Sequence, residues 1–423
     1  MWDRQGGFGL YIASVMRPTP RTGSALALVA LAAVLVSATA SAGTGTSTLP
    51  FIQQAPGEPG FSEQTTTYAP TQATRTIPFW TGRFTDPTNG VTYPYTMVGK
   101  ADPRIAHGGG TTSVPTVIVP LALSFASAGG YTLDGSTKVA AVNASPQLQL
   151  ADYRSTAVAS NSTGVQLEDA TMRSQFNEVG ASPYHLVLGA PTVLPTQTIS
   201  VPKQQGSAFA TPVGPLGLVA AEWFAPKLNE LMNKLHLDPA ALPIFLVDNT
   251  YLYKGNDPTA GGACCVLGFH GAAKPQGSGG GATSSNGNAP IQTFIFASYI
   301  TRGSFRAPFL ADIHALSHEV AEWADDPFVN NFVDPWLTPT APQYGCTDIL
   351  ETGDPVVGIG FNMAGNTYDG GPQADGTWHP EDEVFLPWFA RESPNRTSED
   401  GRYTFMGAAN PFPGFHVPAT GCS

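Results

Sequence analysis

Positive charge is scarce in this chain. Lys and Arg together number 20 of 423 residues, against 32 Asp and Glu, which gives a formal charge of −12, and no basic run occurs. Proteins that bind nucleic acid or anionic membrane surfaces concentrate basic residues on one face or in one run. We therefore expect neither kind of partner.

Two common catalytic motifs are also missing. The chain has no G-x-S-x-G, which carries the nucleophile of many serine hydrolases, and no G-x-x-x-x-G-K-[ST], which cradles nucleotide phosphates. The serine-hydrolase interpretation therefore fails at its nucleophile, and a nucleotide-binding P-loop is excluded.

Apolar runs are short, including the one near the N-terminus. Ala25–Val36 is apolar throughout but shorter than the ~20 residues that a membrane span needs. Arg17 and Arg21 precede it, and the small residues Ala40–Ala42 follow it as a cleavage signal. We interpret residues 1–42 as a signal peptide, starting at Met1 or Met16, and a retained anchor as the alternative. The protein is then secreted, extracellular or periplasmic, with no stable membrane anchor after cleavage.

Cysteine is rare as well, with four residues: Cys264, Cys265, Cys346 and Cys422. An exported chain meets an oxidising compartment, so these residues are disulfide candidates before they are metal ligands. Adjacent cysteines can bridge each other only through a strained ring. We therefore expect Cys264 and Cys265 to pair with Cys346 and Cys422, in an order that the sequence leaves open.

Glycine (46) and proline (38) are abundant, which favours short strands and many turns. We predict an α+β fold. Residues 43–75 are Thr-, Ser- and Pro-rich and indicate a flexible leader, and 76–205 show short alternating runs typical of a β-rich N-terminal domain. Residues 206–423 contain a helical pattern, three strand-like runs and a second helical pattern, which indicate a separate α+β domain.

The second helical pattern is D-I-H-A-L-S-H-E-V-A-E-W-A-D-D-P, residues 312–327. At helical spacing it forms an apolar stripe of Ile313, Leu316, Val320 and Trp323. The opposite side carries His314, His318, Glu322 and Asp325. Histidine and carboxylate side chains on one face of a helix indicate a metal site, although a solvated polar face would show the same pattern.

One ion cannot contact this whole face. His314 and Glu322 lie about 12 Å apart along the helix axis, whereas zinc ligands lie ~2 Å from the metal. We choose His318 and Glu322 as ligands, with His314 as the alternative. Glu319 then follows the first ligand, as in H-E-x-x-H zinc peptidases (zincins), where this Glu is the general base. Here the motif is H-E-V-A-E, and a carboxylate replaces the second imidazole.

The third ligand must come from another segment. Glu351 and Asp354 lie downstream in the turn Y-G-C-T-D-I-L-E-T-G-D-P. We prefer Glu351, since some zincins take their third ligand from a downstream Glu, and keep Asp354 as the second choice. The leading hypothesis is thus a secreted zinc-dependent hydrolase of zincin-like core, most simply a metallopeptidase that acts on extracellular peptide or protein.

Two other functions fit the same residues. The first is a non-catalytic extracellular protein with a structural Ca²⁺ or Zn²⁺ site that binds cell-wall polysaccharide, because carboxylates suit calcium as well. Its candidate ligands are Glu322, Asp325, Asp326, Glu351 and Asp354. The second is a glycosidase that uses paired carboxylates such as Glu319 and Glu351.

His270, in the apolar strand L-G-F-H, is expected to be a core histidine.

Three segments together resemble a known group of proteins. S-H-E-V-A-E-W-A-D-D-P-F-V-N, L-E-T-G-D and C-C-V-L-G-F-H are similar to secreted bacterial zincin-like proteins with an H-E-x-x-E motif and, more distantly, to plant EXORDIUM-like (phosphate-induced) extracellular proteins. The matching positions are Gly268, Phe269, His270, His318, Glu319, Glu322, Asp326, Pro327, Glu351, Gly353 and Asp354. The resemblance covers about residues 220 to 390 and implies secretion or wall association. The plant proteins' Cys after E-I-G-D is absent here, so their disulfide placement does not carry over.

The signal-peptide interpretation predicts the N-terminus of the exported protein. N-terminal sequencing of protein recovered outside the cytoplasm should begin at Gly43, because the cleavage signal ends at Ala42. An intact N-terminus on membrane-bound protein would contradict the prediction and favour a retained anchor.

Overall fold

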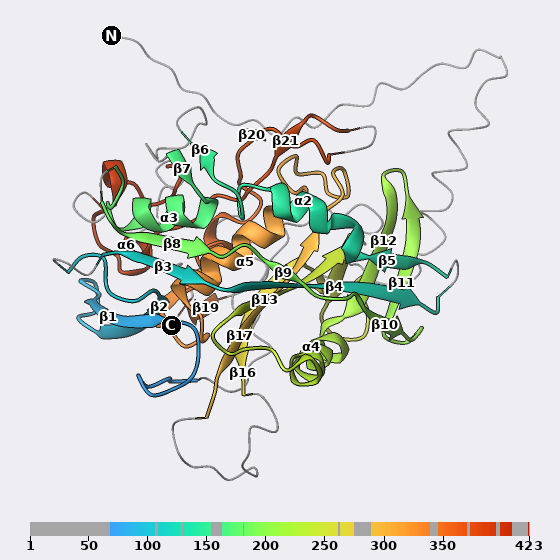
Figure 1. The fold of residues 1–423 in the computed structure, drawn as a ribbon, viewed down its shortest axis with the longest axis horizontal. Helices are drawn as coiled ribbons and strands as arrows, with labels where there is room; N and C mark the ends of the chain where they lie inside the picture. The colour runs from blue at the N-terminus through green and yellow to red at the C-terminus, as the bar shows by residue number, and fades with distance from the viewer. Residues whose placement is uncertain are drawn as a thin grey trace. The chain divides into compact units, whose positions relative to one another are not determined.

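The largest sheet of the protein has seven strands and mixed direction (Figure 1). The structure is a computed structural model, and it describes residues 68–105, 109–127, 130–153, 163–180, 182–260, 263–274, 289–338, 346–369, 373–394, 398–407 and 422. The predicted signal peptide and most of the predicted leader lie outside these residues. Among the described residues, no helix combines the length and apolar character needed to cross a membrane.

Parallel pairing dominates this sheet. Its main strands in spatial order are β10 (Gln197–Val201), β4 (Thr116–Phe125), β13 (Leu242–Asp248), β17 (Gln292–Tyr299) and β16 (Gly268–Ala273), and β5 (Thr132–Asp134) and β9 (Thr192–Val193) pair with β4. The first four run parallel, and β16 runs antiparallel to β17. Strand β13 is apolar and buried along nearly its whole length, and β17 is buried throughout, as strands covered on both faces must be.

Two helices cover the two faces of this sheet. Side chains of β13 alternate: Ile244 and Leu246 pack in the cluster that contains α5 (His314–Asp325), while Phe245 and Val247 pack with α4 (Ala221–Leu235). Figure 1 shows the two helices on opposite sides of the strands. The α+β class predicted from the sequence is therefore confirmed.

The predicted domain boundary between residues 205 and 206 does not divide the structure. Strands β4 and β10 precede it, yet β4 pairs directly with β13, which follows it. The residues that the structure describes, from 68 onwards, belong to one compact unit. The change in composition along the chain reflects where the helices occur, because the strands of both halves share one sheet.

Smaller elements surround the central sheet. A four-stranded sheet contains β11 (Gly206–Thr211), β12 (Gly214–Ala220), β14 (Thr250–Tyr253) and β15 (Cys264–Val266). Two-stranded pairs are β1 (Phe79–Thr85) with β2 (Thr92–Val98), β3 (Thr111–Val114) with β8 (His185–Leu188), β6 (Ala151–Asp152) with β7 (Thr163–Val165), β18 (Phe332–Leu337) with β19 (Cys346–Ile349), and β20 (Met363–Ala364) with β21 (Thr377–Trp378). The short helices are η1 (Gly135–Lys138), α2 (Val139–Ala144), α3 (Leu167–Gln175), η3 (Asp354–Val356), α6 (Leu386–Phe389) and η5 (Glu399–Gly401).

The predicted apolar stripe fixes helix α5 on the sheet. Ile313, Leu316, Val320 and Trp323 all lie in the main core cluster. Trp323 is fully buried, and its indole Nε1 donates a hydrogen bond to Thr293 Oγ1 of β17 at 3.0 Å. This contact satisfies the one polar atom of the ring and fixes the rotation of the helix relative to β17. The opposite, polar face of α5 is thereby aimed at β16 and at the segments that follow β19 and β21.

The cysteines pair differently from the prediction. Cys264 is bonded to its neighbour Cys265, and Cys346 is bonded to Cys422. Cys264 and Cys265 are buried in β15 among apolar side chains, whereas Cys346 is exposed at the start of β19. Cys264 and Cys265 therefore lie in another sheet and another environment than Cys346, which prevents the predicted pairing.

Candidate metal centre

Helix α5 buries its polar face. His318 is 7% exposed, Glu319 3% and Glu322 4%, so the alternative of a solvated helix face is wrong for these residues. Burying an ionised carboxylate is costly unless it is paired, hydrogen-bonded or bound to a cation. The surroundings of this face therefore need to supply partners.

The His318 imidazole is held from both sides. Its Nδ1 lies 2.7 Å from Glu381 Oε2, and the Glu381 backbone N–H in turn donates to Ser317 Oγ at 2.9 Å. Since a carboxylate only accepts, we assign the imidazole proton to Nδ1. The Nε2 lone pair then faces Glu322 Oε1 at 3.1 Å and Asp354 Oδ1 at 3.7 Å. A carboxylate on the far nitrogen is the arrangement that orients histidine ligands in metal sites.

Gly353 lets the downstream loop approach this histidine. A Cβ at this position would collide with the His318 imidazole. Because glycine has no Cβ, the backbone lies close to the ring, and its N–H donates to Glu322 Oε1 at 3.3 Å. The next residue, Asp354, is thereby placed beside His318.

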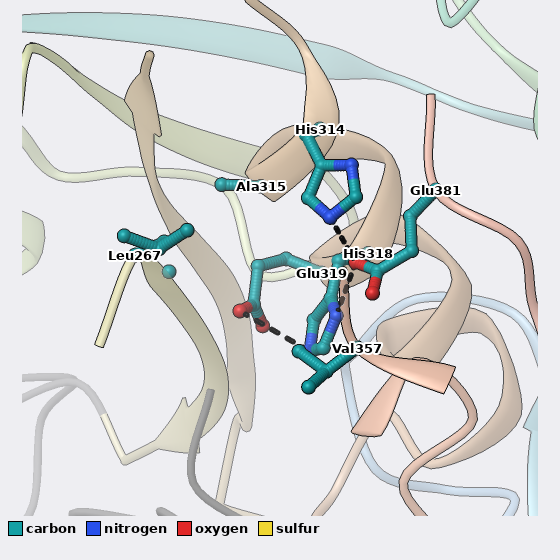
Figure 2. A pocket seen from close by; sticks show the side chains of 8 residues that line it. Leu267, His314, Ala315, His318, Glu319, Val357 and Glu381 are labelled. Carbon is teal, nitrogen blue, oxygen red and sulfur yellow. Dashed lines mark hydrogen bonds and ion pairs between the residues drawn. The ribbon is translucent and has the colours of Figure 1, made fainter. Parts of the chain in front are cut away.

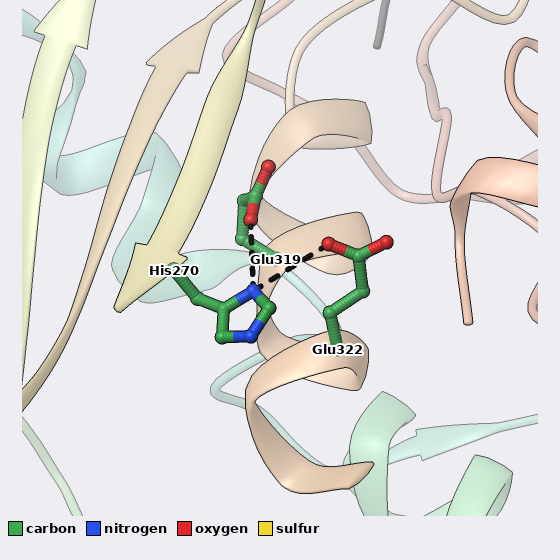
Figure 3. Close-up of side chains that lie close together, drawn as sticks. All are labelled: His270, Glu319 and Glu322. Atoms are coloured by element: carbon green, nitrogen blue, oxygen red, sulfur yellow. Dashed lines mark ion pairs between the residues drawn. The ribbon is translucent and has the colours of Figure 1, made fainter. Parts of the chain in front are cut away.

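A second histidine reaches the site from the edge strand β16 (Figure 3). His270 Nδ1 lies 3.5 Å from Glu322 Oε2, 3.7 Å from Glu319 Oε2 and 3.8 Å from Glu351 Oε2. Its Nε2 donates to the backbone carbonyl of Asp326 at 3.0 Å. His270 is therefore buried, as expected, but it faces the polar cluster and is not a plain core histidine.

All five residues predicted for the site meet in this cluster, in two groups around Glu322. His318 lies at Oε1 of Glu322 with Asp354 beside it, and His270 lies at Oε2 with Glu351 beside it. Two sets of three ligand atoms, each set within 4.8 Å, could each hold a metal ion: His318, Glu322 and Asp354, and His270, Glu319 and Glu322. Of the two candidate loop ligands, Asp354 and not the preferred Glu351 joins His318.

The alternative ligand His314 takes another place. Its Nε2 lies 3.2 Å from Glu381 Oε2, the oxygen that also binds His318. It belongs to neither ligand set among the described residues, and it helps hold the carboxylate that orients His318.

Sequence reasoning missed two residues of the site, His270 and Glu381. For His270 the available signal was the resemblance, which includes G-F-H. For Glu381 it was the acidic run E-D-E at 381–383, unusual in a chain where 12% of residues are charged.

Burial dominates the electrostatics of the cluster. It raises the pKa of Glu319 to about 7, against the lowering effect that His270 and His318 have when they are protonated. Burial also raises the pKa of Glu351 and Asp354 well above the ordinary range, and the Glu322 charge adds to both. Burial opposes ionisation of Glu322 too, but His318 and His270, when they are protonated, hold its pKa below its usual value. A cation among these oxygens would remove the cost of ionising them.

A small cavity lies beside Glu319 and His318 (Figure 2). Its volume is about 20 Å³, which is room for about one water molecule. The lining residues are Leu267, Gly268, His314, Ala315, His318, Glu319, Val357 and Glu381. The Glu319 side chain packs directly against Gly268. A Cβ at this position would lie 2.6 Å from Glu319 Cγ. Any residue larger than glycine would push this carboxylate out of place.

From the buried Asp325 carboxyl at the C-terminal end of α5 we predict that the stability of the protein depends on pH. Asp325 is buried, its Oδ1 accepts a hydrogen bond from Gln175 Nε2 at 2.8 Å, and burial raises its pKa to about 8. Between about pH 4 and pH 8 the folded protein therefore retains a proton that the unfolded chain has lost. The free energy of unfolding should fall as pH rises through this window. Asp325→Asn keeps a neutral acceptor for Gln175, so we expect it to flatten the profile and to be more stable than wild type at pH 8, by on the order of a few kcal/mol.

Urea unfolding at pH 5 and pH 8 measures both effects. Asp238→Asn is the control, because this side chain is more than half exposed and should leave the profile as in wild type. An Asp325→Asn profile as steep as that of wild type would show that Asp325 is ionised in the folded protein.

Comparisons of the chain with models of known families, with curated proteins and with solved structures found no match. The function must therefore be argued from the geometry of this centre.

Proposed function

We propose that the protein is a secreted, metal-dependent hydrolase whose metal is Zn²⁺, held by His318, Glu322 and Asp354. The observation that carries this proposal is the orientation of His318. Its Nδ1 is hydrogen-bonded to Glu381. This bond leaves Nε2 directed at carboxylate oxygens of Glu322 and Asp354. One imidazole and two carboxylates are a donor set that zinc accepts, and three protein ligands are typical of catalytic zinc sites.

Glu319 is the proposed general base. Its Oε1 lies 3.9 Å from His318 Nε2, and its Oε2 has no hydrogen-bond partner in the part of the chain that the structure describes. It also lines the cavity that has room for one water molecule. A carboxylate with a pKa near 7 can take a proton at neutral pH and return it in a later step.

These roles define the reaction. Zinc, when bound, would lower the pKa of a water molecule bound to it and would polarise a substrate carbonyl. Glu319 takes a proton from the attacking water, the water oxygen bonds to the carbonyl carbon, and the carbon–nitrogen bond of a peptide breaks. Glu319 then gives its proton to the departing amine.

The zincin-like core is part of this proposal. Helix α4, strands β13, β16 and β17, and then α5 with its H-E-V-A-E motif follow each other along the chain in the order expected for such a core. Strand β16 is the edge of the central sheet and lies against α5, on the side from which His270 reaches the cluster. The resemblance to secreted zincin-like and EXORDIUM-like proteins supports the same interpretation, as does the predicted signal peptide.

The alternative is a structural cation site in a non-catalytic extracellular protein. The specific observation in its favour is burial, since every ligand named above is less than a tenth exposed. The oxygen-rich cluster would also accept Ca²⁺. In this alternative the cation stabilises the junction of α5 with the loops, and Glu319 has no chemical role.

Glu319→Gln separates the two functions. As the base is lost while His318, Glu322 and Asp354 remain, we expect hydrolysis of a mixed peptide library to fall by at least ~10²-fold, while the zinc held by these three residues is retained. Glu168→Gln is the matched control, because Glu168 is equally buried but lies in α3 and outside the cluster. Full activity of Glu319→Gln, or no hydrolysis by wild type loaded with a single equivalent of zinc, would refute the proposed mechanism and favour the structural cation.

A further inference from the structure

We infer that His270, Glu319 and Glu322 form a second cation position beside the first, with Glu351 as its fourth ligand. The inference rests on the proposed function, because the first position is the one assigned above to His318, Glu322 and Asp354. It concerns the opposite side of Glu322, which that function leaves without a role.

The distances around His270 fit ligands of one ion. Its Nδ1 lies 3.5, 3.7 and 3.8 Å from oxygens of Glu322, Glu319 and Glu351. These separations exceed the roughly 2.7–3.2 Å of N–H···O hydrogen bonds. Four atoms that each lie ~2.1 Å from a tetrahedral zinc are roughly 3.4 Å apart. The ligand atoms of His270, Glu319 and Glu322 thus lie close enough together to hold one cation, and Glu351 lies beside the same imidazole.

The hydrogen bond on the other nitrogen of His270 fixes the direction of its lone pair. Nε2 donates to the Asp326 carbonyl, so a neutral imidazole directs the unprotonated Nδ1 at three carboxylates. A backbone carbonyl is a common orienting partner of histidine ligands. Without a cation, this lone pair would face oxygen lone pairs in a buried space.

A doubly protonated His270 is the competing explanation. An imidazolium Nδ1–H would attract a carboxylate oxygen into a short, charge-assisted hydrogen bond. His318 Nδ1 and Glu381 Oε2 show such a distance in the same cluster, at 2.7 Å. His270 Nδ1 has no oxygen closer than 3.5 Å among its three carboxylate neighbours, so the geometry favours metal ligation.

Unpartnered oxygens give an independent indication. Glu319 Oε2 and Glu351 Oε2 are buried and have no hydrogen-bond partner among the described residues, and both face His270. Buried polar atoms nearly always have a partner, so two orphaned carboxylate oxygens beside one imidazole call for a cation.

Two carboxylates connect the positions. Glu322 directs Oε1 at His318 and Oε2 at His270, and Glu319 directs its two oxygens in the same way. An ion in the second position takes Glu319 Oε2 as a ligand. Glu319 therefore acts as a base only while the second position is empty, which makes this position a means of regulation by metal concentration.

Calorimetric titration of the chelator-treated, dialysed protein with ZnCl₂, its disulfides intact, tests the inference. We expect two equivalents of zinc in wild type and one in His270→Asn. His236→Asn is the matched control, because His236 is exposed in the turn after α4, and it should bind two. Circular dichroism checks the fold of each variant, and Glu351→Gln, which should weaken only the second equivalent, replaces His270→Asn if that variant does not fold.

The outcomes separate this inference from the proposed function. A single equivalent in wild type that His270→Asn leaves unchanged overturns the second position alone. A single equivalent that His270→Asn abolishes and His318→Ala retains overturns both the pair of positions and the ligand set of the proposed function. Absence of zinc binding in wild type overturns both proposals.

Discussion

The buried Glu322 carboxylate is the interaction on which the site depends. It lies between two imidazoles, accepts a backbone N–H from Gly353, and is less than a twentieth exposed. An unpaired charge in such a place would cost several kcal/mol. The Gly353 N–H reduces that cost. The two histidines, oriented by Glu381 and by the Asp326 carbonyl, direct nitrogen lone pairs at two points where a cation would stabilise the carboxylate charge.

The central sheet makes this arrangement possible. Trp323 and its neighbours fix one face of α5 on β17, so that the other face meets β16 and the loops after β19 and β21. Each segment then contributes one or two groups: His270 comes from the strand, Asp354 and Glu351 from one loop, and Glu381 from another. The rigid helix and strand hold the imidazole of His270 and the ligands of α5, while two glycines allow the close contacts.

Local sequence patterns predicted what depends on local periodicity. The α+β class, helix α5, its apolar stripe and the pairing of His318 with Glu322 follow from residues within one or two turns of each other. The H-E-x-x-E spacing also identified Glu319. These features needed no knowledge of the tertiary fold.

The features that could not be predicted from the sequence depend on contacts between residues far apart in the chain. His270 reaches the site through the register of β16 with β17, and β4 joins strands on both sides of the predicted domain boundary. The choice of Asp354 over Glu351 follows from the approach of Gly353 to His318, which no spacing rule contains. The bond between the neighbouring cysteines was likewise hidden, because the distance of β15 from Cys346 is a property of the fold.

Anomalous diffraction from crystals of the protein, recorded on both sides of the zinc absorption edge, would test the central claim most directly. A peak that appears only above the edge, about 2 Å from His318 Nε2, Glu322 and Asp354, is the result expected. A map without zinc at this place, in crystals grown from protein purified with zinc present, would contradict the assignment of a metal centre to helix α5.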